Sequence, residues 1–103
     1  MNSETIYDFQ WDPAKALANE RKHDVTFEEA ATVFLDAATL TVYDEEISEN
    51  EDRWFTLGFD ASGKLLAVAH TYEITEPANV RIRIISARKA TRRERRTYED
   101  DPR

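Results

Sequence analysis

The sequence contains no cysteine, two histidines and two glycines among its 103 residues. A chain without cysteine forms no disulfide and offers a metal no thiolate, and two histidines are too few for a zinc site built from histidine. The glycines, Gly58 and Gly63, are too few for a glycine-rich loop that cradles phosphate. The common nucleotide-binding, hydrolase and zinc-peptidase motifs are therefore absent, and only a carboxylate site for magnesium stays open.

The chain also lacks a long apolar segment. No run approaches the roughly 20 residues needed to cross a bilayer, and residues 1–8 lack the basic-then-apolar pattern of a secretory signal. We therefore expect a cytoplasmic protein with no membrane partner. A length of 103 residues predicts a single domain, 1–103. Residues 1–8 are expected to be a flexible N-terminal lead and residues 100–103 a flexible tail.

Basic side chains are scarce in most of the chain and concentrated near its end. Residues 1–80 hold 5 basic and 17 acidic side chains, residues 81–103 hold 9 and 4, and the two balances of −12 and +5 give the net charge of −7. Such an asymmetry indicates a local face that binds an anion. A solvated helix with many salt bridges is the alternative, and charge alone does not separate the two.

Two helices are predicted near the N-terminus. Asp12 is a good N-cap residue and Pro13 suits the first helical turn, so a helix is expected from residue 12 to residue 23. Thr26 and Glu29 form a capping box that starts a second helix, which is expected to end near residue 35.

The pattern then changes to the two-residue period of β-strands. An acidic loop at 44–52 and a second loop at 75–79 interrupt it. A further capping box, Thr91 with Glu94, predicts a final helix over residues 91–99. The expected fold class is α+β, with two N-terminal helices, a four-stranded antiparallel sheet and a C-terminal helix. The four predicted strands are 39–43, 53–59, 64–73 and 80–88.

The last predicted strand carries Arg81 and Arg83 on one face and Ile82 and Ile84 on the other. If the isoleucines face the helices, the arginines project from the open face of the sheet, and Arg88 follows where the strand ends. Guanidinium groups match phosphate oxygens bidentately, so three arginines on one face suit single-stranded RNA. The alternative is a set of ion pairs, worth about 0–1 kcal/mol each, and the candidate partners are Asp52, Asp60 and Glu73.

Two other kinds of side chain could take part in chemistry. His70 lies in the third predicted strand, and an ordinary histidine pKa of about 6.5 suits proton transfer near neutral pH, although a lone strand histidine more often has a structural role. His23 ends the first helix, where the helix dipole favours a positive charge. Glu94 and Tyr98 share one helical face, on which Tyr98 either donates to a phosphate or packs against the sheet.

Taken in order, the residues resemble a known family over roughly residues 9–99. The matching stretches are Phe9-x-Trp11-Asp12-Pro13-x-Lys15, Asn19, Lys22-His23, Thr26 to Ala30, Phe34-x-Asp36, Arg53, Leu57-Gly58, Val68-x-His70-Thr71, and Arg83 to Glu94 with Tyr98. In this order they resemble the BrnT family of type II toxin–antitoxin modules.

This resemblance implies a fold related to RelE-type ribonucleases and RNA cleavage without a metal, which inhibits translation. It also implies a BrnA-type antitoxin of the ribbon-helix-helix class as partner, with operator DNA bound only through the complex with that antitoxin. One departure is Asp24, which stands where the family commonly has glycine. Glycine would adopt a left-handed helix end more readily.

Metal-independent cleavage uses attack by the RNA's own 2′-hydroxyl on the adjacent phosphate, which requires charge stabilisation and two proton transfers. Arginines are expected to stabilise the charge, and His70 is the first candidate for proton transfer. No cofactor and no metal are expected. The rival hypothesis is a non-catalytic subunit that binds a partner protein or nucleic acid and holds its arginines in ion pairs. The expected catalytic residues are His70, Arg83, Arg88, Glu94 and Tyr98, and the expected RNA-binding residues are Lys22, His23, Arg53, Arg81 and Arg92.

Overall fold

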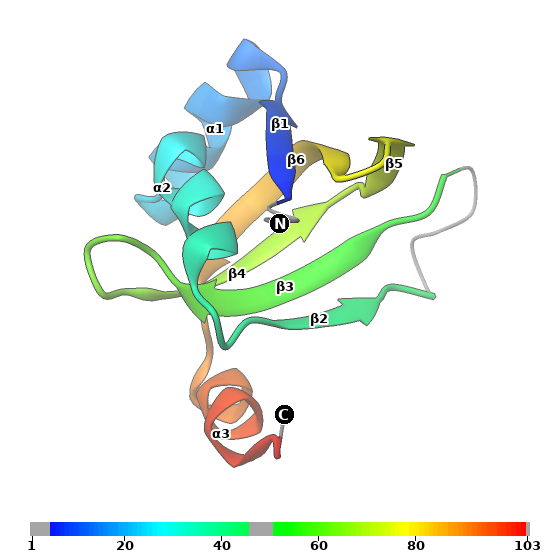
Figure 1. Ribbon diagram of the computed structural model, residues 1–103. Helices are drawn as coiled ribbons and strands as arrows, with labels where there is room; N and C mark the ends of the chain where they lie inside the picture. The colour runs from blue at the N-terminus through cyan, green and yellow to red at the C-terminus, as the bar shows by residue number, and fades with distance from the viewer. Residues whose placement is uncertain (1–4, 46–50, 103) are drawn as a thin grey trace.

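A computed structural model describes residues 5–45 and 51–102. Residues 46–50 of the expected acidic loop, the first four residues of the expected lead and the last residue of the expected tail lie outside the described residues. The elements, drawn in Figure 1, are β1 (Ile6–Gln10), α1 (Pro13–His23), α2 (Phe27–Thr32), the 3-10 helix η1 (Val33–Leu35), β2 (Leu40–Tyr43), β3 (Trp54–Phe59), β4 (Leu65–His70), β5 (Glu73–Glu76), β6 (Asn79–Lys89) and α3 (Arg92–Asp100).

The strands form one six-stranded mixed sheet in the order β1-β6-β4-β3-β2, with β5 also paired to β6. The pairs β2–β3, β3–β4 and β4–β6 are antiparallel, as the sequence predicted for these four segments. The expectation of a purely four-stranded antiparallel sheet is wrong, because β1 pairs parallel with β6 and β5 adds a short antiparallel strand.

The two extra strands have weak sequence signals. In β1 only Tyr7 and Phe9 are half-buried, and the strand lies partly in the range expected to be a lead. In β5 all four side chains are exposed, so no apolar alternation marks it as a strand. The loop expected at 75–79 is shortened to a tight turn, in which Ala78 has a positive φ of 69°.

The helix boundaries follow their predicted capping residues. Both capping boxes, at Thr26 and at Thr91, are present with reciprocal hydrogen bonds. Asp24 ends α1 in the left-handed conformation with φ 57°, and its backbone N–H donates to the Glu20 carbonyl at 2.8 Å. Aspartate therefore adopts the left-handed conformation here, although glycine would adopt it at a lower cost in free energy.

The helices cover different parts of the sheet. The larger core lies between one face of the sheet and α1, α2 and η1, and it includes Phe27 and Val33 from the helices and Ile82 and Ile84 from β6. A smaller cluster on the opposite face contains Leu57, Ala67 and Tyr98, and Tyr98 anchors α3 there by donating to Asp36 at 2.7 Å. Figure 1 shows α3 well separated from α1 and α2.

A β-bulge in β6 determines which side chains share a face. Ala69 pairs with Ser86, but the next residue of β4, His70, pairs with Ile84, so Ile85 is one extra residue in β6. The bulge reverses the alternation of the strand. Ala87 therefore packs into the core beneath the helices, and Arg88 projects to the opposite face, where its guanidinium lies 5.5 Å from the centre of the Phe55 ring.

The buried side chain of Asn19 supports β6 just beyond the bulge. Strand β1 ends its pairing with β6 at Arg83, and the Asn19 amide of α1 continues the pairing in its place. Its Nδ2 donates to the Ala87 carbonyl at 2.8 Å and to the Val25 carbonyl at 3.0 Å, and its Oδ1 accepts from the Ala87 N–H at 3.0 Å. This one side chain ties α1 and the start of α2 to the strand that carries the arginines.

Candidate functional site

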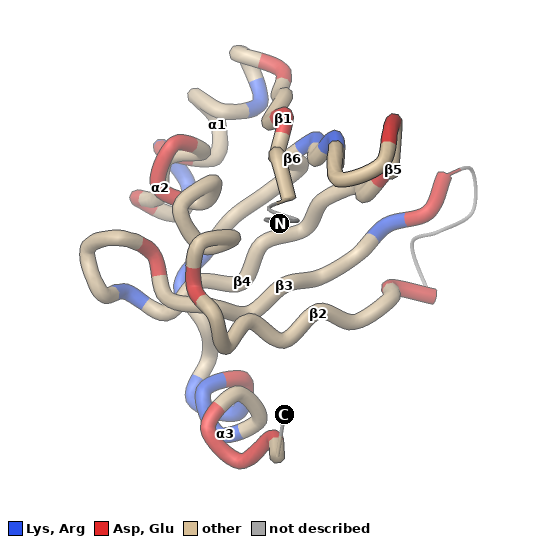
Figure 2. The backbone as a smooth tube through the Cα atoms, viewed as in Figure 1, with Lys and Arg blue, Asp and Glu red and all other residues tan. Residues whose placement is uncertain are grey.

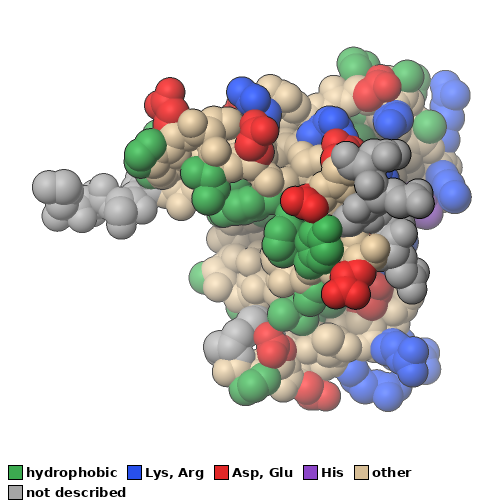
Figure 3. Space-filling model, turned by 90° about the vertical axis from the view of Figure 1, so that its right-hand side faces the viewer, with side chains coloured by type: hydrophobic (Ala, Val, Ile, Leu, Met, Phe, Trp, Pro, Cys, Tyr) green, Lys and Arg blue, Asp and Glu red, His purple; other side chains and the backbone are tan. Residues whose placement is uncertain are grey.

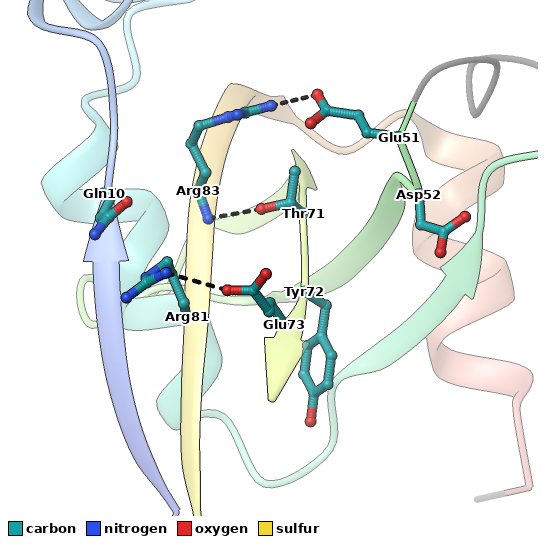
Figure 4. A pocket seen from close by; sticks show the side chains of 8 residues that line it. All are labelled: Gln10, Glu51, Asp52, Thr71, Tyr72, Glu73, Arg81 and Arg83. Carbon is teal, nitrogen blue, oxygen red and sulfur yellow. Dashed lines mark hydrogen bonds and ion pairs between the residues drawn. The ribbon is translucent and has the colours of Figure 1, made fainter. Parts of the chain in front are cut away.

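A cavity of about 470 Å³ lies on the face of the sheet from which Arg81 and Arg83 of β6 project. We call it the arginine pocket. Figure 4 shows its side chains coming from the ends of β1 and β5, from β6 and from the segment that leads into β3. Its lining residues are Gln10, Glu51, Asp52, Thr71, Tyr72, Glu73, Arg81 and Arg83.

Arg81 is held between carboxylates of the two strands that flank β6. Asp8 of β1 and Glu73 of β5 are its cross-strand neighbours, and they lie 3.5 Å and 3.1 Å from its guanidinium nitrogens. All three side chains are about half exposed, so each ion pair contributes about 0–1 kcal/mol. Glu73, one of the candidate partners in the alternative of ion pairs, therefore does pair with Arg81.

Arg83 is held by its backbone and by a second carboxylate. Its N–H donates to Thr71 Oγ1 at 3.1 Å and its carbonyl accepts from the Thr71 N–H at 3.0 Å. Its guanidinium pairs with Glu51, and the same Glu51 oxygen lies 3.4 Å from Arg53. Glu51 thereby brings Arg83 of β6 together with Arg53, the residue before β3, although β3 and β6 are not neighbours in the sheet.

The other expected ion-pair partners act elsewhere. Asp52 accepts a hydrogen bond from the Tyr43 hydroxyl at 2.8 Å. Asp60 lies 3.8 Å from Lys64 in the turn after β3. Neither of them pairs with Arg81 or Arg83.

Arg88 lies on the same face of the sheet but is engaged with α3. It donates two hydrogen bonds to Glu94, at 2.7 Å and 2.9 Å. These bonds raise the pKa of Arg88 and lower the pKa of Glu94. Glu94 also accepts from the Thr91 N–H at 2.8 Å, so a single carboxylate caps α3 and joins it to the sheet.

His70 lies away from the arginines, contrary to the role expected for it. Its side chain is fully buried on the helix-covered face, where Phe34 packs edge-on at 5.0 Å. Nε2 lies 2.6 Å from Thr56 Oγ1 and Nδ1 lies 2.8 Å from the Thr71 carbonyl oxygen. Burial lowers the pKa of His70, although the Thr71 carbonyl opposes the shift. A neutral ring with both nitrogens already bonded is poorly placed to exchange protons with RNA on the arginine face.

The remaining expected site residues are dispersed. Tyr98 is buried against Phe59 rather than open to a ligand. Lys22 and His23 border a separate cavity of about 230 Å³ between α1 and β6. Arg92 is exposed at the start of α3. Figure 2 shows basic residues near the start of β6, again at its end and in α3, with uncharged residues between the two groups on β6. We call these groups together the basic tract.

Sequence reasoning missed several residues of the arginine pocket. Gln10 enters it because β1 pairs parallel with β6 and places Gln10 beside Arg83. Thr71 and Tyr72 enter it because β4 ends at His70 and the chain turns into β5. Each of these positions depends on a strand that has almost no apolar signal, so the sequence pattern gave no means of finding them.

Two absences among the described residues bear on the class of site. Across residues 5–45 and 51–102 there is no group of three or more histidine, aspartate or glutamate side chains arranged to hold a metal ion. None of the helices within these same ranges has the length and apolar character that a membrane crossing needs.

The fold has a solved counterpart among toxins. The chain is similar to the crystal structure of the Brucella abortus ribonuclease toxin BrnT, with a TM-score of 0.62 and 20% identity, over 85% of this chain and 100% of that one. At this identity the likeness shows the fold, an α+β domain. The sequence itself matches, over residues 11–94, the family described as "Ribonuclease toxin, BrnT, of type II toxin-antitoxin system". The chain therefore belongs to the BrnT family. No curated protein sequence matches it.

Proposed function

We propose that this member of the BrnT family is an endoribonuclease that cleaves RNA without a metal ion, through attack by the 2′-hydroxyl on the adjacent phosphate, and so inhibits translation in the cytoplasm. The observation that carries the proposal is the arginine pocket, in which Arg81 and Arg83 flank a cavity of about 470 Å³. Guanidinium groups are suited to bind the phosphate and to stabilise the extra negative charge of the transition state.

The ion pairs of the pocket do not prevent this function. Glu51 holds the guanidinium of Arg83, and both side chains are partly exposed. An exposed ion pair is worth about 0–1 kcal/mol, so an RNA phosphate that brings its own charge and bidentate geometry can replace the carboxylate. Glu73, 3.1 Å from Arg81, is then the carboxylate best placed to accept the proton of the 2′-hydroxyl.

We propose different roles for the expected residues outside the pocket. Arg88 and Arg92 extend the basic tract toward α3, where the RNA strand continues. Glu94 positions Arg88 and caps α3, and Tyr98 fixes α3 to the sheet. The partner is an antitoxin of the BrnA-type ribbon-helix-helix class, through which operator DNA is bound. Its acidic or apolar groups would cover the same arginine face and silence the toxin.

The test is RNA cleavage by the purified protein in excess EDTA, compared with Arg83→Ala. Removing a group that contacts the developing charge lowers the rate about 10²-fold or more. Arg21→Ala, an exposed arginine of α1, is the matched control and should cleave at the wild-type rate. The products should carry 2′,3′-cyclic phosphate and 5′-hydroxyl ends.

Equal cleavage by the wild type and Arg83→Ala would mean that the pocket is not the active site or that the activity is a contaminant. Absence of cleavage by either would favour the non-catalytic alternative, in which the ion-paired arginines bind only a partner. Growth arrest on expression without an antitoxin would then be absent as well.

A further inference from the structure

A second cavity, of about 410 Å³, lies on the face of the sheet opposite the arginine pocket. We call it the aromatic pocket. Its volume is in the range of small-molecule sites, and none of the expected site residues except His70 belongs to it. Figure 3 views the molecule from the side on which β2 ends and β3 begins, and it shows hydrophobic side chains gathered near the middle of this side. The lining residues are Tyr7, Phe34, Thr39, Thr41, Trp54, His70 and Tyr72.

Two pairs of aromatic rings form the walls of the aromatic pocket. Trp54 and Tyr72 lie with ring centres 6.4 Å apart at an angle of 61°, and Tyr7 and Phe34 lie 5.9 Å apart at 46°. None of these four rings is fully buried, and Tyr72 is 43% exposed. Tyr7 stacks on Phe9 at an angle of 21° and Phe34 packs against His70, so the rings best placed to meet a planar ligand are those of Trp54 and Tyr72.

The aromatic pocket adjoins the arginine pocket through Tyr72, which lines both. The pairing of β3 with β4 ends at Trp54 and His70, and β5 pairs with β6 rather than with β3. The edge of the sheet is therefore open at Tyr72, and Figure 4 shows the Tyr72 ring directed away from Arg83. A chain whose phosphate lies on Arg83 can place the group attached next to it on the other side of Tyr72.

The polar side chains of the aromatic pocket have a fixed hydrogen-bond direction. The Thr71 carbonyl can only accept, so the His70 Nδ1, 2.8 Å away, carries the proton. In the neutral ring Nε2 then accepts from Thr56 Oγ1 at 2.6 Å. Thr56 in turn accepts from Thr41 Oγ1 at 2.8 Å, which leaves the oxygen of Thr41 as an acceptor at the pocket.

We propose that the aromatic pocket binds an unpaired nucleobase of the RNA whose phosphate occupies the arginine pocket. The base stacks on Trp54, with the Tyr72 ring, inclined at 61° to Trp54, against its edge, and it donates an N–H to Thr41. Aromatic side chains beside a basic tract are the usual means of holding single-stranded nucleic acid, and every base has both a flat face and an N–H donor. This assignment rests on the proposed function and adds a recognition site to it.

The test measures binding without cleavage. The probe is a fluorescent single-stranded heptanucleotide of 2′-O-methyl RNA, in which the nucleophile is blocked, together with a set in which one nucleotide at a time is abasic. Affinities are measured by fluorescence anisotropy for the wild type and for Trp54→Leu, Thr41→Val and Arg83→Ala. Trp11→Leu makes the same change at another half-buried tryptophan and is the matched control. Circular dichroism reports whether each variant folds. The series of abasic probes is measured on the wild type, so its result does not depend on the folding of any variant.

The expected result is that one abasic position weakens wild-type binding about 5- to 100-fold, the range for loss of one stacked base. Trp54→Leu should bind the intact probe more weakly by the same factor, and its affinity should no longer change when that position is abasic. Thr41→Val should lower the affinity about two- to tenfold, as expected for the loss of one hydrogen bond. Trp11→Leu should change neither the affinity for the intact probe nor its dependence on the abasic position.

Wild-type binding that depends on Arg83 but is indifferent to every abasic substitution would overturn the nucleobase site and leave the ribonuclease proposal intact. Base-dependent binding through Trp54, without Arg83-dependent cleavage of unmodified RNA, would support the site and remove the ribonuclease. If no probe binds, both proposals fail.

Discussion

Replacing Asn19 by alanine tests whether one buried amide holds β6 in place. The side chain is 7% exposed and makes three hydrogen bonds, two to Ala87 and one to Val25. Alanine would leave the N–H and carbonyl of Ala87 and the carbonyl of Val25 without this partner. These groups lie in the core between α1, α2 and the sheet.

The magnitude follows from those three groups. A buried polar group left without a partner costs about 1–3 kcal/mol. Water that enters the space left by the amide offsets part of this cost, and alanine favours the helix by about 0.5 kcal/mol more than asparagine. The expected loss in the free energy of unfolding is therefore about 3–5 kcal/mol, a large share of the roughly 5–15 kcal/mol of a typical domain.

Urea unfolding followed by circular dichroism measures the effect, and an unchanged slope shows that only stability has changed. Asn79→Ala is the control, because among the residues that the structure describes the Asn79 amide makes one side-chain contact, at 3.4 Å to Glu76 at an exposed position. The free energy of unfolding of Asn79→Ala should fall by less than about 1 kcal/mol. If Asn19→Ala also loses less than about 1 kcal/mol, the bonds to Ala87 do not support the strand as argued.

Two further substitutions test the packing and the charges around α2. A Cβ atom at Gly58 would lie 2.7 Å from Val33 Cγ1 and 2.9 Å from Thr39 Cγ2, so Gly58→Ala should cost about 1–3 kcal/mol in urea unfolding. If Gly58→Ala costs as much in a Val33→Ala background as in the wild type, the clash with Val33 is not its main cause. The hydrogen bond from Lys64, 2.5 Å away, lowers the pKa of Glu29 from 4.5 to about 2. A carboxylate with a lowered pKa stabilises the fold above its unfolded pKa and loses that contribution as pH falls toward about 2. Glu29→Gln should therefore flatten the fall in stability between about pH 4.5 and about pH 2 by about 1 kcal/mol, and an unchanged profile would count against the pair.

The predictable part of the fold is the part with strong local signals. The capping boxes at Thr26 and Thr91 fix their own hydrogen bonds within four residues, so the helix starts followed from the sequence. The four apolar strands followed from their alternation. Strands β1 and β5 did not, because their stability depends on pairing with β6 rather than on buried side chains of their own.

The candidate site shows the same division. Alternation was enough to place Arg81 and Arg83 on the face opposite Ile82 and Ile84. It could not show that His70 faces the other way, buried with Thr56, because a histidine in an alternating strand looks the same on either face. The carboxylate bridge through Glu51 joins Arg83 of β6 to Arg53, which is distant in the chain, and no local pattern encodes such a contact.

The bulge at Ile85 has a consequence for how sequences of this kind are compared. Removing a single residue there would leave the composition nearly unchanged, yet it would exchange the two faces of everything that follows in β6. Arg88 would turn into the core and Ala87 would turn outward. A one-residue gap at this point in an alignment is thus a change of surface chemistry and not of loop length.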